Sequence, residues 1–221
     1  MIEEAIAAAG TSSGGEKVKP NTRYPDLYLA SKSPRRRELL SQIGVFFEVM
    51  AVDIPEHPQP GETTLEHVSR LALEKAQAGL SKLMREGKPV SAPVLGSDTL
   101  VVVGGKALGK PADQGQAVDM LLQLSGRGHQ VMTGVAIVDE SREQVIATVT
   151  EVKVKPISPD EAQAYWNTGE PADKAGAYGI QGYGAVFIDE IKGSYTGVVG
   201  LPLSETAELL KAFNVPVWRT G

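Results

Sequence analysis

The chain has 221 residues, of which 22 are lysine or arginine, 27 are aspartate or glutamate and none is cysteine. This length fits one domain or two small ones and suffices for a sizeable core. Without cysteine the chain has no disulfide, thiolate metal site or cysteine nucleophile, which is compatible with a cytoplasmic location. The net charge of -5 argues against a nucleic-acid polymer or an anionic membrane as the partner.

The first 25 residues differ in composition from the rest of the chain. Residues 10–15 are small, polar and rich in helix breakers, so residues 1–25 are predicted to be a disordered extension before a single domain over residues 26–221. Glu3 and Glu4 occupy the place of a basic region, which excludes a secretory signal. No segment approaches the roughly 20 apolar residues of a membrane span.

Beyond residue 25, short apolar runs alternate with stretches of helical periodicity. Strands are predicted over residues 27–31, 46–53, 94–103, 130–138, 145–155 and 185–191. Helices are predicted over residues 34–43, 64–84, 117–124, 160–167 and 202–213, and Gly44, Gly126 and Gly169 end three of them. The fourth and fifth strands are expected to form an antiparallel hairpin. The pattern predicts an α/β fold with a mixed sheet and flanking helices.

The link between the first strand and the first helix is rich in hydroxyls and cations. It reads Ser31-Lys32-Ser33-Pro34-Arg35-Arg36-Arg37, with Pro34 suited to the first helical position and Ser33 to the N-cap. Cations at this end of a helix oppose its dipole unless an anion lies among them, and backbone N–H groups, hydroxyls and guanidinium groups together can bind phosphate. A phosphate site and a solvated basic turn are equally compatible with these residues.

The run Gly96-Ser97-Asp98-Thr99 interrupts an otherwise apolar strand, and a bend or a strand end is predicted there. A partly buried carboxylate needs a partner or a metal ion. Asp98 is therefore either a magnesium ligand or general base, or a turn aspartate that accepts backbone hydrogen bonds. The residues alone favour neither interpretation.

Two glycine-rich segments need separate interpretation. Residues 104–110 match most of a Walker A loop, but Pro111 stands where Ser or Thr is required, so a turn between two strands is predicted instead. Residues 174–184 carry Gln181 between two tyrosines, which could read or flank a planar base. For glycine-rich stretches in general, however, a flexible surface loop is the favoured interpretation.

From about Leu27 to Phe213 the chain resembles the Maf family of nucleoside triphosphate pyrophosphatases. Seven motifs, in the family's order and spacing, carry the resemblance. They are Ala30-Ser31-x-Ser33-Pro34-Arg35-Arg36, Ile54-Pro55-Glu56, Leu71-Ala72-Leu73-Glu74-Lys75-Ala76, Gly96-Ser97-Asp98-Thr99, Gly109-Lys110-Pro111, residues 174–182 and Gly200-Leu201-Pro202. The resemblance implies a fold related to the inosine-triphosphate pyrophosphatases, with two lobes around a cleft.

The resemblance also implies hydrolysis of a nucleoside triphosphate to the monophosphate and pyrophosphate, with Mg²⁺ or Mn²⁺. One branch of the family cleaves dTTP and UTP, and another prefers 7-methyl-GTP. Arg35, Thr99 and Gln181 match the dTTP/UTP branch. A homodimer is the assembly that the family often forms. The alternatives are a nucleotide-binding regulator of division or septation with little hydrolysis, and a sugar-phosphate or polyphosphate hydrolase.

Carried over to this chain, the resemblance assigns a role to each matching residue. It assigns the triphosphate to Ser31, Ser33, Arg35 and Arg36. It assigns the metal ion to Glu56 and Asp98, with Asp98 also the proton acceptor, and charge neutralisation to Lys75 and Lys110. It assigns the base to Thr99 and Gln181. Lys32 and Arg37 depart from the family pattern and are expected to add positive charge near the phosphates.

Overall fold

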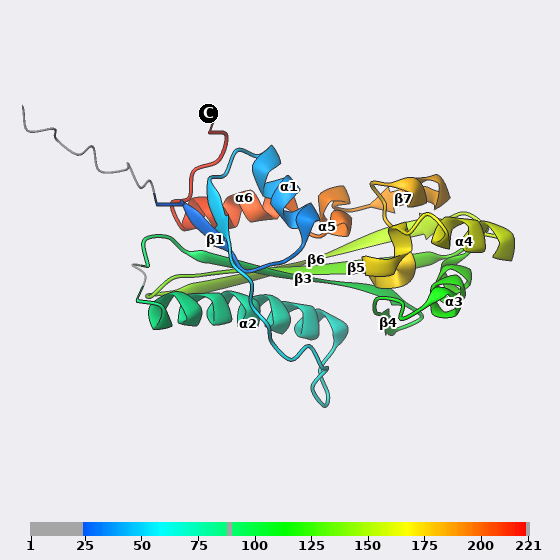
Figure 1. The fold of residues 1–221 in the computed structure, drawn as a ribbon, viewed down its shortest axis with the longest axis horizontal. Helices are drawn as coiled ribbons and strands as arrows, with labels where there is room; N and C mark the ends of the chain where they lie inside the picture. The colour runs from blue at the N-terminus through cyan, green and yellow to red at the C-terminus, as the bar shows by residue number, and fades with distance from the viewer. Residues whose placement is uncertain (1–23, 88–89, 220–221) are drawn as a thin grey trace, which may run out of the picture.

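The computed structural model describes residues 24–87 and 90–219, and Figure 1 shows its fold. The strands are β1 (Leu27–Leu29), β2 (Phe47–Val49), β3 (Val94–Val103), β4 (Lys106–Leu108), β5 (Gly128–Val138), β6 (Glu143–Val154) and β7 (Ile188–Lys192). The α-helices are α1 (Pro34–Gln42), α2 (Thr64–Arg85), α3 (Gln114–Leu124), α4 (Pro159–Trp166), α5 (Tyr195–Val199) and α6 (Leu203–Ala212). Three 3-10 helices are η1 (Glu170–Asp173), η2 (Ala175–Ala177) and η3 (Tyr183–Phe187).

The described strands form one mixed sheet in the order β2-β1-β3-β5-β6-β7, with β4 paired to β3. β1 is parallel to β2 and β3, whereas the pairs from β3 to β7 are antiparallel. The parallel part follows from the β1–α1–β2 crossover, and the antiparallel part from the long β5–β6 hairpin. The predicted α/β fold with a mixed sheet and flanking helices is confirmed.

Helices cover both faces of the sheet. α2 lies along one face of β3 and β5, while α1, α5 and α6 lie on the other, as Figure 1 shows. α2 approaches the sheet closely because two facing strand positions are glycines. A Cβ added at Gly96 would lie 2.2 Å from Ala72 O, and one at Gly134 would lie 2.5 Å from Val68 O.

The predicted interruption at Gly96–Thr99 is wrong. β3 runs through these residues in regular register with β5, and Asp98 pairs with Gly134. The glycine marks the close contact with α2 rather than a bend, because glycine in a strand also serves where another backbone approaches closely. Asp98 is therefore held on a rigid strand in the middle of the sheet.

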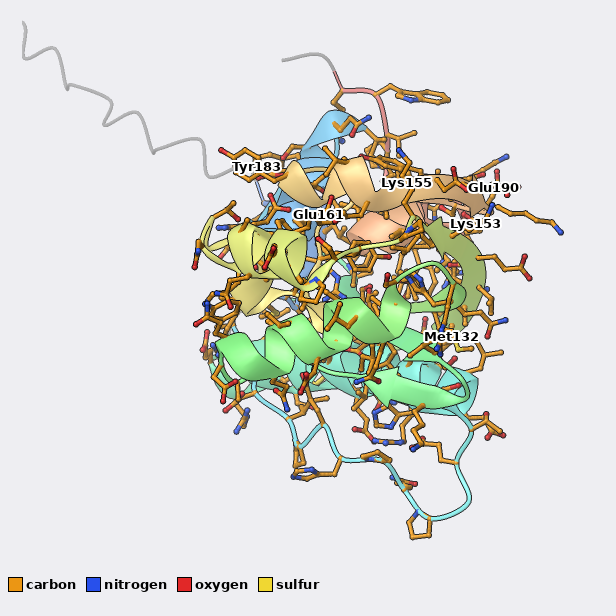
Figure 2. The ribbon with its side chains drawn as sticks, turned by 90° about the vertical axis from the view of Figure 1, so that its right-hand side faces the viewer. Met132, Lys153, Lys155, Glu161, Tyr183 and Glu190 are labelled. Atoms are coloured by element: carbon orange, nitrogen blue, oxygen red, sulfur yellow. The ribbon has the colours of Figure 1, made fainter. Side chains whose placement is uncertain are left out.

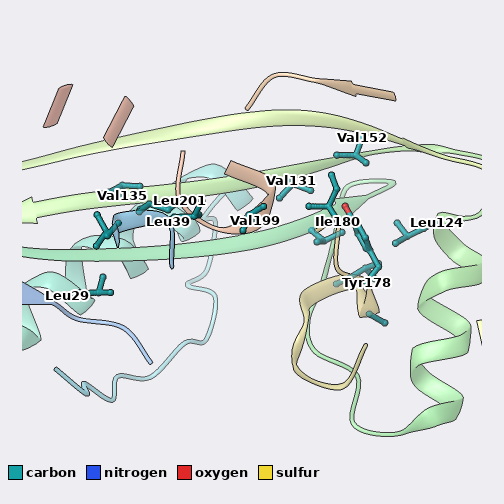
Figure 3. Packing of buried hydrophobic residues seen from close by; sticks show 14 of the residues in the cluster. Leu29, Leu39, Leu124, Val131, Val135, Val152, Tyr178, Ile180, Val199 and Leu201 are labelled. Atoms are coloured by element: carbon teal, nitrogen blue, oxygen red, sulfur yellow. The ribbon is translucent and has the colours of Figure 1, made fainter. Parts of the chain in front are cut away.

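The prediction of a flexible surface loop over residues 174–184 is wrong for residues 176–180, which are buried, whereas Gln181, Gly182 and Tyr183 are exposed. Tyr178 and Ile180 are each 7% exposed, and Figure 3 shows both among the side chains of the larger core cluster, near Val131 and Leu124. The hydroxyl of Tyr178 lies 2.8 Å from Nε2 of the buried His129. Apolar residues between the glycines thus bury the first part of this segment in the core and leave Gln181 at its exposed end.

Several element boundaries differ from those predicted. β2 covers three residues of the predicted 46–53 strand because its only partner in the described sheet is the short β1. The predicted strand over 185–191 begins at Ile188, after η3. α5 was not predicted, since five residues are too few for a helical period. Gly44, Gly126 and Gly169 have positive φ, as expected for residues that end helices.

The extension predicted for residues 1–25 lies almost entirely outside the described residues, which begin at Tyr24. Within residues 24–87 and 90–219, no helix combines the length and apolar character needed to cross a membrane. The division into an extension and one domain, the cytoplasmic location and the homodimer stay predictions.

Candidate active site

A cavity of about 610 Å³ is the cleft that the resemblance implies. All ten residues assigned to the site from the sequence line it, although they come from six separate parts of the chain. They are Ser31, Ser33, Arg35, Arg36, Glu56, Lys75, Asp98, Thr99, Lys110 and Gln181. Lys32 also lines the cavity, whereas Arg37 is exposed and does not. The fold thus brings the assigned residues together, and their individual roles stay predictions.

At the centre of the cavity one ammonium group joins two carboxylates. Lys75 Nζ on α2 donates to Asp98 Oδ1 on β3 at 2.6 Å and lies 2.7 Å from Glu56 Oε1 in the segment after β2. The Asp98 side chain is 11% exposed, whereas the Glu56 side chain is 58% exposed. Burial alone would raise the pKa of Glu56, but Lys75 and then Lys110 and Arg36 outweigh it and hold that pKa below its usual value.

The donor set fits a hard divalent cation. Glu56 and Asp98 offer carboxylate oxygens, the ligands that Mg²⁺ prefers, and their shared ammonium partner shows that they converge on one positive charge. No group of three His, Cys, Asp or Glu residues suited to a metal ion occurs in the described chain. Two carboxylates completed by water and substrate phosphates are the usual arrangement for Mg²⁺.

Arg36 is locked in place near the start of α1. Its Nε donates to Gly200 O at 2.9 Å, its Nη2 to Thr99 Oγ1 at 3.1 Å and its Nη1 to Ser31 Oγ at 3.4 Å. Burial lowers the pKa of Arg36, and Asp98 opposes that shift. Arginine nevertheless stays protonated in proteins, because its usual pKa is above about 12. The guanidinium group therefore forms a fixed positive wall of the cavity that ties α1 to β3 and to the end of α5.

Arg36→Lys is expected to lower the free energy of unfolding by about 1–3 kcal/mol. A lysine ammonium is a point donor and cannot reach Gly200 O, Thr99 and Ser31 in the planar arrangement of a guanidinium group. Equilibrium urea unfolding measures the change. The matched control is Arg37→Lys on the exposed neighbour, which should shift the value by less than about 0.5 kcal/mol. Equal effects of the two substitutions would contradict the locking role.

Arg35 has an acidic partner that the sequence did not single out. Arg35 Nη1 lies 3.1 Å from Asp173 Oδ2, and Lys174 Nζ lies 2.7 Å from Asp173 Oδ1. Asp173 comes directly before the glycine-rich motif that begins at residue 174, and this position is the one feature of the sequence that could have marked it as a site residue. The Asp173 carboxylate thus joins the start of α1 to the glycine-rich segment at the cavity.

Serine and threonine hydroxyls complete the wall around Arg36. Ser33 occupies the N-cap position of α1 with Pro34 after it, but its side chain makes no capping hydrogen bond. The backbone N–H of Ser33 donates to Ser31 Oγ at 3.2 Å. Besides Arg36, the Thr99 hydroxyl contacts the Thr133 hydroxyl at 3.1 Å. Ser33 is therefore the hydroxyl of this group that lacks a side-chain partner in the described structure.

The β3–β4 turn confirms that residues 104–110 are not a phosphate-binding P-loop. Gly104 and Gly105 form a hairpin turn with φ of 55° and 76°. Lys110 follows β4, and the next helix begins only at Gln114. A P-loop needs a helix directly after the lysine to present its N-terminus to the phosphate. Lys110 instead projects from an irregular segment that lines the cavity.

A family model for Maf-like proteins matches residues 26–213 of this chain. The chain belongs to the Maf family. This match spans every segment of the cavity, from Ser31 through the β3 strand to Gly200. The extent of the Maf match agrees with the resemblance that the sequence motifs carry.

Several Maf relatives are named dTTP/UTP pyrophosphatase. The relative from Saccharophagus degradans is 57% identical over 88% of this chain and 91% of its own length. The relative from Aromatoleum aromaticum is 52% identical over 86% of this chain and 97% of its own length. Among solved structures, the Staphylococcus aureus Ham1 protein matches with a TM-score of 0.38 at 15% identity, covering 58% of this chain and 71% of that one.

Proposed function

We propose that this Maf protein is a nucleoside triphosphate pyrophosphatase that hydrolyses dTTP and UTP to the monophosphate and pyrophosphate. The observation that carries the proposal is that two carboxylates and several cations line one cavity. The chain is also 50–57% identical to relatives named dTTP/UTP pyrophosphatase. Several cations around one small polyanion are the expected design for phosphoryl transfer, where electrostatic stabilisation dominates.

The triphosphate would lie among the cations at the start of α1. Arg35 and Arg36 offer bidentate contacts, Ser33 offers a hydroxyl, and the first backbone N–H groups of α1 lack helical partners. On binding, a phosphate oxygen competes with Asp173 for Arg35. Lys110, which lines the same cavity, would neutralise charge on the pyrophosphate leaving group. The local positive charge of this cavity thus contrasts with the net charge of -5 of the whole chain.

Asp98 is the proposed proton acceptor for the attacking water. Its carboxylate is nearly buried and is held by Lys75, so it has a fixed direction toward the cavity. Lys75 also stabilises negative charge as it develops on the α-phosphoryl group. When bound by Glu56 and Asp98, Mg²⁺ or Mn²⁺ would neutralise phosphate charge and acidify water.

The base would meet the glycine-rich side of the cavity. The carboxamide of Gln181 offers one acceptor and one donor side by side, which matches the edge of uracil or thymine. Gln181 is exposed and lines the cavity, as base recognition requires. Because the Thr99 hydroxyl already contacts Arg36 and Thr133, we expect Thr99 to act mainly by holding Arg36.

The test is hydrolysis of dTTP, UTP, CTP, GTP and 7-methyl-GTP at equal concentration with Mg²⁺. Release of the monophosphate and pyrophosphate, with dTTP and UTP the best substrates, would support the proposal. A preference for 7-methyl-GTP would refute the branch assignment. Nucleotide binding without cleavage would favour the division regulator, and cleavage that ignores the base would favour a polyphosphate or sugar-phosphate hydrolase.

Removing divalent cations with EDTA is expected to lower dTTP hydrolysis at least about 100-fold, because metal ions contribute several kcal/mol of transition-state stabilisation. Added Mg²⁺ or Mn²⁺ should restore it. Glu56→Gln should raise the Mg²⁺ concentration for half-maximal rate about tenfold, since weakened ligation typically costs 10–100-fold in metal affinity. Glu48→Gln on the exposed β2 strand is the matched control. Full activity in EDTA would contradict the metal proposal.

A further inference from the structure

The segment that presents Gln181 is bound after that residue by the Glu170 carboxylate and before it by the Tyr165 hydroxyl. Glu170 Oε2 accepts the N–H of Tyr183 at 2.8 Å, and Glu170 Oε1 accepts the N–H of Gly184 at 3.0 Å. The Tyr165 hydroxyl donates to Glu170 Oε1 at 2.5 Å and accepts the N–H of Gly179 at 2.9 Å. Two residues, Glu170 and Tyr165, thus anchor residues 179–184, which we call the Gln181 segment.

The glycines of this segment are required by the carboxylate. A Cβ added at Gly182 would lie 1.9 Å from Glu170 Oε2, and one at Gly179 would lie 2.9 Å from Glu170 Oε1. A Cβ at Gly184 would lie 2.6 Å from the Tyr165 hydroxyl oxygen. None of these three glycines has a positive φ, so space and not backbone conformation excludes a side chain. The Gln181 segment is built to wrap around Glu170.

The anchor is charged under neutral conditions. Burial alone would raise the pKa of Glu170, but hydrogen bonds from Tyr165, Gly184 and Tyr183 and the charge of Lys174 outweigh it and lower that pKa. Burial raises the pKa of Tyr165, so its hydroxyl stays protonated and can donate. Hydrogen bonds to an ionised acceptor are about twice as strong as neutral ones. The ionised Glu170 thus holds the backbone after Gln181 firmly.

Gln181 depends on this anchor for its position. In the described part of the chain its side chain has no hydrogen-bond partner, and it is exposed at the cavity. A carboxamide can distinguish bases only if its oxygen and nitrogen are held at set positions, and here the neighbouring backbone must set them. Glu170 itself does not line the cavity. Figure 2 shows Tyr183, which bonds to Glu170, at the surface above α4.

We propose that Glu170 is a positioning residue for base selection, which holds Gln181 in register with the pyrimidine through the backbone that follows it and, by way of the Tyr165 hydroxyl, through the backbone that precedes it. This inference rests on the proposed function for the identity of the ligand. It assigns part of the substrate preference to a carboxylate that does not touch the nucleotide. The aromatic partner Tyr165 supports the same anchor from α4.

The variant that tests the proposal is Glu170→Gln. The Glu170 carboxylate accepts hydrogen bonds from the Tyr165 hydroxyl and from the N–H groups of Tyr183 and Gly184. A carboxamide keeps only one acceptor oxygen and sets its NH₂ group, a donor, against one of these donors, so that hydrogen bond is lost. The matched control is Glu161→Gln, also a glutamate that accepts a backbone N–H, but the N–H of Ser158 at the start of α4 and not one of the Gln181 segment. Tyr165→Phe is a second, milder variant that keeps the Glu170 contacts to Tyr183 and Gly184.

Two measurements are made on the full chain without turnover. Amide hydrogen exchange at Gly179, Tyr183 and Gly184 should accelerate in Glu170→Gln, while exchange in β5 stays as in wild type. Dissociation constants are measured for α,β-imido-dUTP and α,β-imido-dGTP, whose α–β bridge resists cleavage. The preference for the dUTP analogue should fall about tenfold in Glu170→Gln, less in Tyr165→Phe and not in Glu161→Gln.

A double-mutant cycle separates positioning from a general loss of stability. Gln181→Ala should itself reduce the preference, and adding Glu170→Gln in that background should reduce it no further, because both changes remove one interaction. Additive losses, an unchanged preference in Glu170→Gln or unchanged amide exchange would each overturn the inference.

Hydrolysis of dTTP, assayed in parallel, distinguishes the two proposals. A wild-type protein that prefers the dUTP analogue but does not cleave dTTP refutes the proposed function and leaves this inference standing. If the wild type cleaves dTTP but Glu170→Gln keeps the wild-type preference for the dUTP analogue, this inference is refuted and the proposed function stands. A wild-type protein that binds neither analogue refutes both.

Discussion

Replacing Asp98 with asparagine is expected to lower the turnover of dTTP by a factor of about 10²–10⁴, the usual contribution of a positioned general base. Asparagine has nearly the same shape, and its Oδ1 can still accept the hydrogen bond from Lys75 Nζ that the structure places at 2.6 Å. Lys75 also keeps its contact with Glu56 at 2.7 Å. The substitution therefore removes the proposed proton acceptor and the negative charge of one proposed metal ligand, while it leaves the surrounding packing in place.

The measurement is pyrophosphate release under saturating dTTP and Mg²⁺, with thermal unfolding and circular dichroism as checks of the fold. Asp119→Asn, on the exposed face of α3 and outside the cavity, is the matched control and should turn over dTTP as the wild type does. If Asp98→Asn retained wild-type turnover, Asp98 could be neither the proton acceptor nor an essential metal ligand.

Gly96→Ala is expected to destabilise the protein by about 3 kcal/mol, at the upper end of the usual cost of overpacking a core. The added methyl group would lie 2.2 Å from Ala72 O and 2.6 Å from Ala76 N, both of them backbone atoms of α2. A helix backbone cannot rotate away as a side chain can, so α2 must shift as a unit. Because α2 carries Lys75, the same shift should also reduce activity.

Equilibrium urea unfolding measures the change in the free energy of unfolding. Gly128→Ala is the matched control, because Gly128 also lies in a strand but has nothing within 4 Å of an added Cβ and no positive φ. It should alter stability by less than about 0.5 kcal/mol. Similar costs at the two positions would show that the clash with α2 does not govern stability here.

The contrast between Gly96 and the helix-ending glycines shows which parts of the fold were predictable. Gly44 and Gly169 end helices through positive φ, a local property that the pattern of neighbouring residues reveals. Gly96 instead avoids contact with a helix whose residues lie some twenty positions away in the chain. No local pattern distinguishes that role from a bend, so the prediction of an interrupted β3 was wrong.

The same reasoning applies to the candidate site. Ser31, Asp98 and Lys110 could be selected from the sequence because each lies in a short motif typical of the Maf family. Asp173 and Glu170 could not, because their significance comes from their partners. Asp173 contacts Arg35, 138 positions away, and Glu170 binds the backbone of residues 183 and 184.

By itself, the sequence determined the type and order of most elements, the family and the residue types available for phosphate chemistry. Periodicity and short motifs are local, and they persist whatever the final packing. Only the tertiary structure decided that Lys75 joins Glu56 to Asp98 and that the glycine-rich segment is packed around Glu170. Those contacts depend on how the sheet brings distant segments to one cavity, and the free energy of that packing is not encoded in any single stretch of the chain.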